Sequence, residues 1–189
     1  METVTLTTER LVLRAPSEAD IEAIEAACQD PEIPRWTTVP SPYTRENAVD
    51  FVRLVAGWWA EDKETVWAIF VDDRLSGMIG LHDIEQHHTG GHAEIGFWMT
   101  ADARGQGYLA EAARAVVDWG FSELGLVRIA WRAVAGNVPS ASAARALGFH
   151  YEGMQRQALT SPRGRDDGWF AGLLVDDDRA PVDWPVLAV

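Results

Sequence analysis

Residues 92–121 read HAEIGFWMTADARGQGYLAEAARAVVDWGF, and this stretch decides the fold. Its first part, His92 to Met99, follows a turn at His87 to Gly91 and is predicted to be a strand. From Gly107 to Phe121 the apolar residues recur at helical spacing, which predicts a helix. Between the two lies a glycine-rich turn at residues 104–110. A strand that passes through such a turn into a long helix is typical of an α/β domain.

The turn has the chemistry of an anion site. Gly105 and Gly107 let the backbone approach a ligand closely. The free N–H groups at the start of the helix point at that ligand, and the helix dipole favours an anion there. Arg104 can add charge-assisted hydrogen bonds. We therefore predict that a phosphate or pyrophosphate lies against seven residues: Arg104, Gly105, Gln106, Gly107, Tyr108, Leu109 and Ala110.

The same glycines match the dinucleotide fingerprint G-x-G-x-x-G/A, with Ala110 in the last position. That fingerprint requires an acidic residue about 20 residues further on, which holds the ribose. The corresponding region, Ile129 to Val134, contains Arg132 and no acidic residue, and the turn lies past the middle of the chain. Nicotinamide binding is therefore disfavoured. A glycine-rich turn without any ligand stays open as an alternative.

The chain before this stretch predicts one strand and two helices. Residues 10–14 alternate polar and apolar side chains, as a half-buried strand does. Ser17 and Asp20 form a capping-box-like helix start, and the prolines at positions 31 and 34 are expected to end that helix. A second helix starts with residue 44. Its apolar face comprises Ala48, Val52, Val55 and Trp59.

From residue 65 the spacing of the apolar residues is no longer helical, and the sequence predicts strands. Thr65 to Val71 and Ser76 to Leu81 are joined by a turn, and with residues 92–99 they form three consecutive antiparallel strands. After the long helix come a strand, Leu126 to Ala133, and a short helix, Pro139 to Leu147. Two last strands, from Phe149 onward and at residues 169–175, enclose a loop at residues 161–168.

This order predicts an α/β fold (an α+β mixed sheet) with a central mixed sheet of about seven strands flanked by about four helices. The length of 189 residues suits one domain. We expect that domain to span residues 1–178 and an irregular C-terminal tail to span residues 179–189.

Composition narrows the class of partner. The formal net charge of −13 disfavours nucleic acid as a partner, because an acidic protein repels polyanions and attracts cations. The alternative that the acidity serves only solubility stays open. The chain has one cysteine, Cys28, no signal-peptide pattern at its start, and no apolar stretch of the roughly 20 residues that span a bilayer. We expect a cytoplasmic protein without a membrane or nucleic-acid partner.

The turn resembles a motif of the GNAT superfamily of N-acetyltransferases, Q/R-x-x-G-x-G/A before a long helix. Arg104 and Gly107 match this motif, and Leu109 departs from it, since glycine or alanine is usual there. Further segments are similar to the RimJ/RimL-like branch, which acetylates protein N-termini among other amines: Thr8 to Arg14, Asp20, Ala93 to Trp98, Asn137 to Ser140 and Leu147 to Phe149. The resemblance runs from about residue 8 to residue 178.

The resemblance implies an N-acyltransferase that moves an acetyl-type group from acetyl-CoA to a primary amine, either a protein N-terminus or a small molecule. It implies that acyl-CoA lies where the strands around Glu94 and Leu126–Ala133 splay apart, with backbone donors stabilising the oxyanion. It leaves open the acceptor, larger or acidic acyl groups, and the choice between monomer and homodimer. Beyond the glycine-rich turn, the implied cofactor contacts are Phe97, Trp98, Met99 and Asn137.

Glu94 is the candidate base. Alternation along the strand places it on one side with His92, Gly96 and Trp98, where a carboxylate can accept a proton from an ammonium group. The family often has a glutamate base at this position, and an exposed or salt-bridged glutamate is the alternative. By resemblance, Ser140 is the candidate donor of a proton to the leaving thiolate. A helix-start serine with a purely structural role stays open.

Two further interpretations are weaker. The histidines at positions 82, 87, 88 and 92 have a spacing that fits no compact zinc site, so we expect a polar hairpin and no metal. A non-catalytic acyl-CoA sensor or interaction module would keep the fold without turnover. Retention of both Glu94 and Ser140 argues against that alternative.

Overall fold

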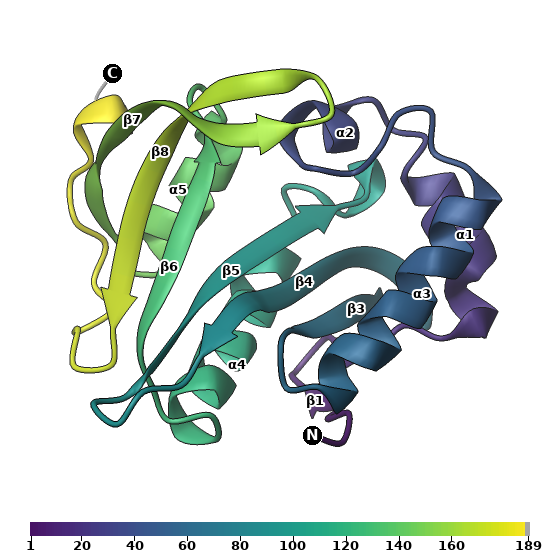
Figure 1. Ribbon diagram of the computed structural model, residues 1–189, viewed down its shortest axis with the longest axis horizontal. Helices are drawn as coiled ribbons and strands as arrows, with labels where there is room; N and C mark the ends of the chain where they lie inside the picture. The colour runs from purple at the N-terminus through teal and green to yellow at the C-terminus, as the bar shows by residue number, and fades with distance from the viewer. Residues whose placement is uncertain (188–189) are drawn as a thin grey trace.

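One eight-stranded mixed sheet organises the protein, and the computed structural model describes residues 1–187 (Figure 1). The strands lie in the order β1-β2-β3-β4-β5-β6-β8-β7. All neighbours are antiparallel except β5 and β6, which run parallel, so the predicted mixed sheet and the β3-β4-β5 meander are confirmed. The strands are β1 (Leu6–Thr7), β2 (Val12–Arg14), β3 (Thr65–Val71), β4 (Arg74–Glu85), β5 (Gly91–Met99), β6 (Leu126–Val134), β7 (His150–Ser161) and β8 (Gly164–Leu174).

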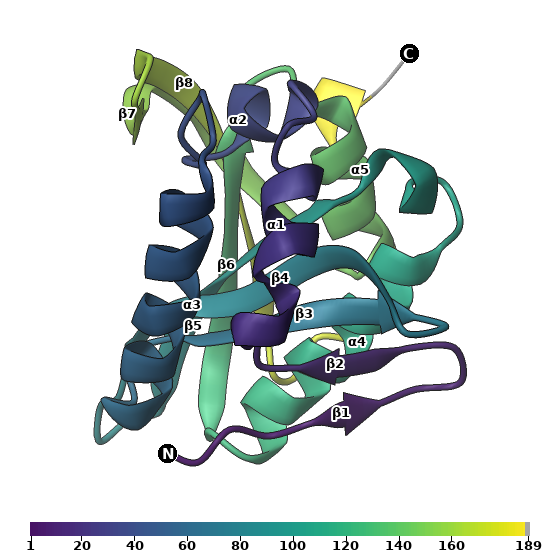
Figure 2. The ribbon, with the colours of Figure 1, turned by 90° about the vertical axis from the view of Figure 1, so that its right-hand side faces the viewer.

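Helices cover both faces of the sheet (Figures 1 and 2). On one face, Gly120 of α4 lies so close to Leu81 of β4 that an added Cβ would come within 2.9 Å of that side chain. On the other face, α3 packs on α1 and on β3. No helix within residues 1–187 is long and apolar enough to cross a membrane. The helices are α1 (Ile21–Ala27), α2 (Glu32–Trp36), α3 (Arg45–Ala60), α4 (Tyr108–Ser122) and α5 (Val138–Ala146).

The predicted helix starts are confirmed. Ser17 and Asp20 form a capping box, in which the Asp20 carboxylate accepts hydrogen bonds from the backbone N–H and the hydroxyl of Ser17 at 2.7 and 2.9 Å. Arg14 donates two hydrogen bonds of 2.8 Å to the same carboxylate. Burial alone would raise the pKa of Asp20, but the bonds from Arg14 and Ser17 hold it below its ordinary value. Thr44 caps α3 in the same way through Asn47.

The structure differs from the sequence-based prediction in three segments. A short strand that is not predicted, β1, precedes β2, the first predicted strand, and pairs with it. A short helix, α2, follows α1, so Pro34 lies inside a helix instead of ending one. The predicted loop at residues 161–168 is mostly strand, because β7 continues to Ser161 and β8 begins at Gly164. This end of the hairpin is rich in polar and charged residues and largely exposed, so its sequence lacks the apolar alternation that indicates a strand.

The C-terminal segment returns to the sheet. The indole of Trp184 is buried and donates a 2.9 Å hydrogen bond to the backbone oxygen of Phe149. Its ring also packs against Trp131 of β6 and Tyr151 of β7, with ring centroids 5.4 and 5.5 Å away. A short 3-10 helix, Pro185–Leu187, follows. These contacts tie residues 184–187 to α5 and β6, which form one side of the cleft described below.

Candidate active site

A cleft opens where β5 and β6 separate. The first paired residues of the two strands are Gly91 and Leu126, and the last are Glu94 and Ala130. Beyond that point β5 stays with β4, and β6 stays with β8 (Figure 1). The resulting cleft has a volume of about 1280 Å³ and continues between the α1–α3 segment and the β7–β8 hairpin. A gap in a sheet exposes unpaired backbone groups, so it can bind a polar, extended ligand.

Backbone donors line the β5 side of this gap. The N–H of Thr100 donates to the oxygen of Ser76 beside β4, at 2.9 Å. Successive N–H groups of a strand point to opposite edges. The N–H groups of Phe97 and Met99 therefore point into the gap, where β6 no longer pairs with β5. Trp98 also lines the cleft. The segment 97–99 therefore offers donors where an oxyanion in the gap would lie.

The glycine-rich turn closes one end of the cleft. Gly105 and Gly107 have φ values of +74° and +79°, which is the left-handed region where glycine is favoured. Gly107 is the N-cap of α4, and no side chain within residues 1–187 caps this helix. The N–H groups of the first helical turn are therefore free to bind an anion. Tyr108, Leu109 and Ala110, which make up that turn, all line the cleft.

Glu94 lies at the point of separation and faces the cleft. Its Oε2 is 2.7 Å from Nε of Arg132 on β6, and Arg132 also reaches Asp83 at 3.7 Å. Burial raises the pKa of Glu94 above its ordinary value, while Arg132 and His82 oppose the rise. Glu94 is thus both the cleft carboxylate and the salt-bridged glutamate that the sequence left as alternatives.

Asn137 and Ser140 lie on the β6 side of the cleft, at the start of α5. Asn137 is buried, and its Oδ1 accepts the N–H of Ser140 at 3.3 Å, so the residue is a helix cap. This hydrogen bond uses only the oxygen of the Asn137 side-chain amide. The indole N–H of Trp131 donates to the Ser140 hydroxyl oxygen at 3.2 Å. That bond leaves the hydroxyl hydrogen of Ser140 free for another acceptor.

Residues 10–150 match the family described as the Acetyltransferase (GNAT) domain. The chain belongs to the GNAT acetyltransferase family. It is an N-acyltransferase that moves an acetyl-type group from an acyl-CoA donor, acetyl-CoA, to an amine. The family membership favours the enzyme over the non-catalytic sensor that the sequence left as an alternative.

Relatives agree with this assignment. The uncharacterized N-acetyltransferase YoaA of Bacillus subtilis (strain 168) is 33% identical over 156 residues, which cover 82% of this chain and 87% of YoaA. RimL, a ribosomal L7/L12 alpha-N-protein acetyltransferase solved in complex with coenzyme A, has a TM-score of 0.83 at 20% identity, covering 94% of this chain and 100% of RimL. The microcin C7 self-immunity acetyltransferase MccE, solved with acetyl-CoA and AMP, has a TM-score of 0.81 at 17% identity, covering 89% and 94%. The two structures confirm the GNAT fold.

Two arginines shape the glycine-rich turn of this acetyltransferase. Arg104, predicted as a phosphate ligand, donates to the Met99 backbone oxygen at 3.1 Å and pairs with Asp30 at 2.7 Å. It therefore holds the end of β5 against the segment after α1. Arg10 donates to the Gln106 backbone oxygen at 3.1 Å. The sequence missed this contact, because 96 residues separate the two partners.

Arg10 also stabilises the first turn of α4. Its guanidinium lies over the Tyr108 ring, 4.8 Å from the centroid, and pairs with Glu111 at 2.6 Å. The segment from Thr8 to Arg14 carries part of the family resemblance, but no local pattern in the sequence connects it with the turn. Arg10 thus places a second guanidinium beside the glycine-rich turn of the acetyltransferase.

A histidine–carboxylate pair that the sequence did not predict faces the cleft beside Glu94. Nδ1 of His82 lies 2.6 Å from Oε2 of Glu64, and both residues line the cleft. His82 is the cross-strand partner of Glu94. Its ring lies over Gly80 and Gly96, where an added Cβ would come within 3.1 and 3.0 Å of ring atoms. Two glycines on adjacent strands therefore make room for this imidazole.

The far side of the cleft is enclosed by α2 and the tip of the β7–β8 hairpin. Arg163, in the turn between β7 and β8, donates to the backbone oxygen of Pro34 in α2 and pairs with Asp166 at 3.6 Å. The hydrogen bond from Arg163 to Pro34 connects two residues that lie 129 positions apart in the chain. Carboxylates outnumber arginines along the whole cleft, which is lined by Glu32, Asp50, Glu64, Asp83, Glu94 and Asp166 and by Arg104, Arg132 and Arg163.

Proposed function

We propose that this acetyltransferase acetylates the α-amino group of a peptide or protein N-terminus. The observation that carries the proposal is the excess of carboxylates over arginines along the cleft, which extends beyond Glu94 to the β7–β8 hairpin. Carboxylates attract an ammonium group, and a long cleft accommodates residues that follow it. RimL, which has the same fold, is a ribosomal L7/L12 alpha-N-protein acetyltransferase, and this supports the choice.

The glycine-rich turn is proposed to hold the pyrophosphate of the donor. The free N–H groups of residues 108–110 and the dipole of α4 favour an anion there, and the conformations of Gly105 and Gly107 allow close approach. Arg104 is proposed to support this site through its bond to Met99 rather than as a free cation. Asn137 would bind the pantetheine arm through its amide N–H groups.

Proton removal is proposed to depend on Glu94 and His82. An ammonium group has no lone pair, so it must lose a proton before it attacks. Glu94 accepts that proton directly or through a water molecule. Glu64 holds the imidazole of His82 at 2.6 Å, which orients the other ring nitrogen toward the space over Gly96. We infer that His82 is a positioning residue that holds a water or passes the proton onward to Glu64.

Charge at the reaction centre is proposed to be stabilised from both sides of the gap. The N–H groups of Phe97 and Met99 would bind the oxygen on which negative charge develops. Ser140 would donate its hydroxyl hydrogen to the departing sulfur, because Trp131 already occupies its oxygen as a donor. The remaining rate enhancement would come from holding amine and thioester together in the cleft.

The acceptor class is tested by following thiol release from acetyl-CoA with matched acceptors. A short peptide with a free N-terminus is compared with the same peptide carrying a formyl-blocked N-terminus and an internal lysine, and with a polyamine. We expect the free N-terminus to give a kcat/KM about tenfold or more above either other acceptor. Faster turnover of the polyamine would instead assign a small-molecule amine, and faster turnover of the blocked peptide would assign a lysine side chain.

Three further properties are inferred for the acetyltransferase. The net charge of −13 supports the absence of a nucleic-acid partner. The single cysteine, Cys28, is buried and cannot form an internal disulfide, which supports a reducing, cytoplasmic environment. We propose one domain over residues 1–178 in a monomer or homodimer, with Trp184 anchoring the tail to it. Light scattering of the purified chain tests the oligomeric state.

A further inference from the structure

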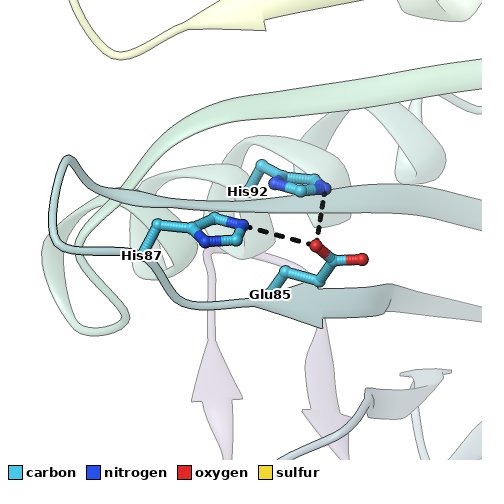
Figure 3. A group of neighbouring side chains, drawn as sticks. All are labelled: Glu85, His87 and His92. Atoms are coloured by element: carbon cyan, nitrogen blue, oxygen red, sulfur yellow. Dashed lines mark ion pairs between the residues drawn. The ribbon is translucent and has the colours of Figure 1, made fainter.

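Three side chains of metal-ligand type meet at the hairpin between β4 and β5. They are Glu85, His87 and His92, and none of them is among the residues that line the cleft. Their candidate ligand atoms all lie within 4.8 Å of one another. Figure 3 shows both imidazole rings directed at the Glu85 carboxylate. His88, in the same turn, is not a member of the group.

A β-bulge brings the three residues to one place. His82 pairs with Glu94, whereas Glu85 pairs with His92, so β4 has one residue more than β5 between these two pairs. Asp83, within this bulge, has a φ of +49°. Because residues of a strand alternate between faces, the extra residue turns Glu85 to the face that carries His92. The spacing of the residues along the chain gives no indication of this.

The distances suit a metal ion better than direct bonds between the three side chains. Nε2 of His87 and Nε2 of His92 lie 3.4 and 3.9 Å from the same carboxylate oxygen of Glu85. The second separation is beyond a hydrogen bond, and the first is longer than usual. A tetrahedral ion with ligands at 2.0–2.2 Å holds its ligand atoms about 3.4 Å apart. The three residues are exposed or partly exposed, so rotation about their side-chain bonds can bring the ligand atoms to that separation.

The backbone around the group is already fixed. The Gln86 amide donates to the Leu124 backbone oxygen at 2.9 Å, and the Gly91 N–H donates to the Gly125 oxygen at 3.3 Å. Both arms of the hairpin are thus tied to the segment that precedes β6. The turn itself is closed by the N–H of Gly90, which donates to the oxygen of His87 at 3.0 Å. A preformed site loses less conformational entropy when it binds an ion.

We propose that Glu85, His87 and His92 form a site for one Zn²⁺ ion. Two imidazole nitrogens and one carboxylate oxygen are a ligand set that suits zinc, while Mg²⁺ and Ca²⁺ prefer oxygen ligands. The side chains are 59%, 54% and 43% exposed, so water completes the coordination. The site lies at the hairpin that leads into β5, on the face of that strand that also carries Glu94. Bound zinc joins the two arms of that hairpin and stabilises the folded protein by mass action.

The proposal is tested by calorimetric titration of the tag-free chain with Zn²⁺ after removal of metal by a chelator. We expect one ion per chain for the native protein, and no saturable binding of Mg²⁺. His87→Ala and His92→Ala each weaken zinc binding by about tenfold or more, and Glu85→Gln weakens it in the same direction. The matched control is His88→Ala, which removes a histidine from the same turn and keeps native affinity.

A thermal melt provides a second measurement. Zn²⁺ raises the melting temperature of the native chain and of His88→Ala, but not that of the double variant His87→Ala/His92→Ala. Circular dichroism without metal shows that each variant folds. The absence of saturable zinc binding to the native chain overturns the proposal, as does native affinity in both single histidine variants. Neither outcome bears on acetyl transfer, which is measured separately by thiol release.

Discussion

Oε2 of Glu94 lies 2.7 Å from Nε of Arg132, and this ion pair bridges the point where β5 and β6 separate. Glu94 is the last residue of β5 that is paired with β6, and Arg132 is two residues beyond its partner Ala130. The pair thus joins the two walls of the cleft. It also places the proposed base under two opposing influences, since burial raises its pKa and the guanidinium lowers it.

Glu94→Gln keeps the shape of the side chain and removes its basicity. We expect turnover near pH 7 to fall about 100-fold or more. Activity should recover partly at higher pH, where more of the amine is already neutral. For an N-terminal α-amine this recovery begins near pH 8, and for a lysine-like amine about two units later. A kcat–pH profile measures it, with coenzyme A binding as the control for folding; native rates at every pH would exclude Glu94 as the base.

Arg132→Met removes the cation beside Glu94. The base acts only when deprotonated, so the rate falls as the pH drops through the pKa of Glu94. Without Arg132, burial is less opposed and this pKa rises further, which moves the acidic limb of the kcat–pH profile to higher pH. Arg128→Met is the matched control, because Arg128 lies on the same strand and pairs with Glu152 instead. An equal shift in both variants would contradict the assignment.

His82→Gln removes the imidazole beside Glu94. If His82 holds a water or passes the proton onward, kcat falls roughly tenfold, while KM for acetyl-CoA changes little. Glu64→Gln should reproduce part of this loss, because Glu64 orients the His82 ring. Rates and pH profiles of both variants are compared with the native enzyme. A change in KM alone, with native kcat, would indicate that the pair only shapes the acceptor side of the cleft.

Ser140→Ala tests the proposed proton donor to the leaving sulfur. We expect kcat to fall roughly 10- to 1,000-fold with little change in coenzyme A affinity. Ser142→Ala is the matched control, since Ser142 is exposed on the same helix. Steady-state rates are measured together with coenzyme A titrations. Unchanged turnover in Ser140→Ala would show that Ser140 is only part of the helix start and that the proton comes from elsewhere.

Gly107→Val tests the anion site at the start of α4. Gly107 has a φ of +79°, so valine strains the turn and blocks close approach of the backbone to a phosphate. We expect coenzyme A to raise the melting temperature of the native chain and not of this variant. Gly125→Val carries similar strain at a φ of +62°, away from the cleft, and should keep the response. A nicotinamide dinucleotide that stabilises the native chain when coenzyme A does not would contradict the site.

Much of the fold follows from local sequence patterns. The capping pair of Ser17 with Asp20 and the helix start at Thr44 are as expected, because a helix start depends on residues only a few positions apart. The glycines of the turn before α4 adopt the left-handed conformations for which glycine is suited. The two strands of the β7–β8 hairpin are predicted, but its tip at residues 161–168 is predicted as a loop, because this end is largely exposed and no alternation of apolar residues marks it as strand.

The sequence by itself determined most of the elements, their order and the residue types around the predicted anion site, because helical period, strand alternation and turn chemistry are local properties. Only the tertiary structure decided which side chains meet. Arg10 reaches the turn at Gln106 across 96 residues, and the bulge in β4 turns Glu85 toward His92. Contacts of this kind depend on strand register and on where two strands separate, and one extra residue in a strand reverses the face of every side chain beyond it.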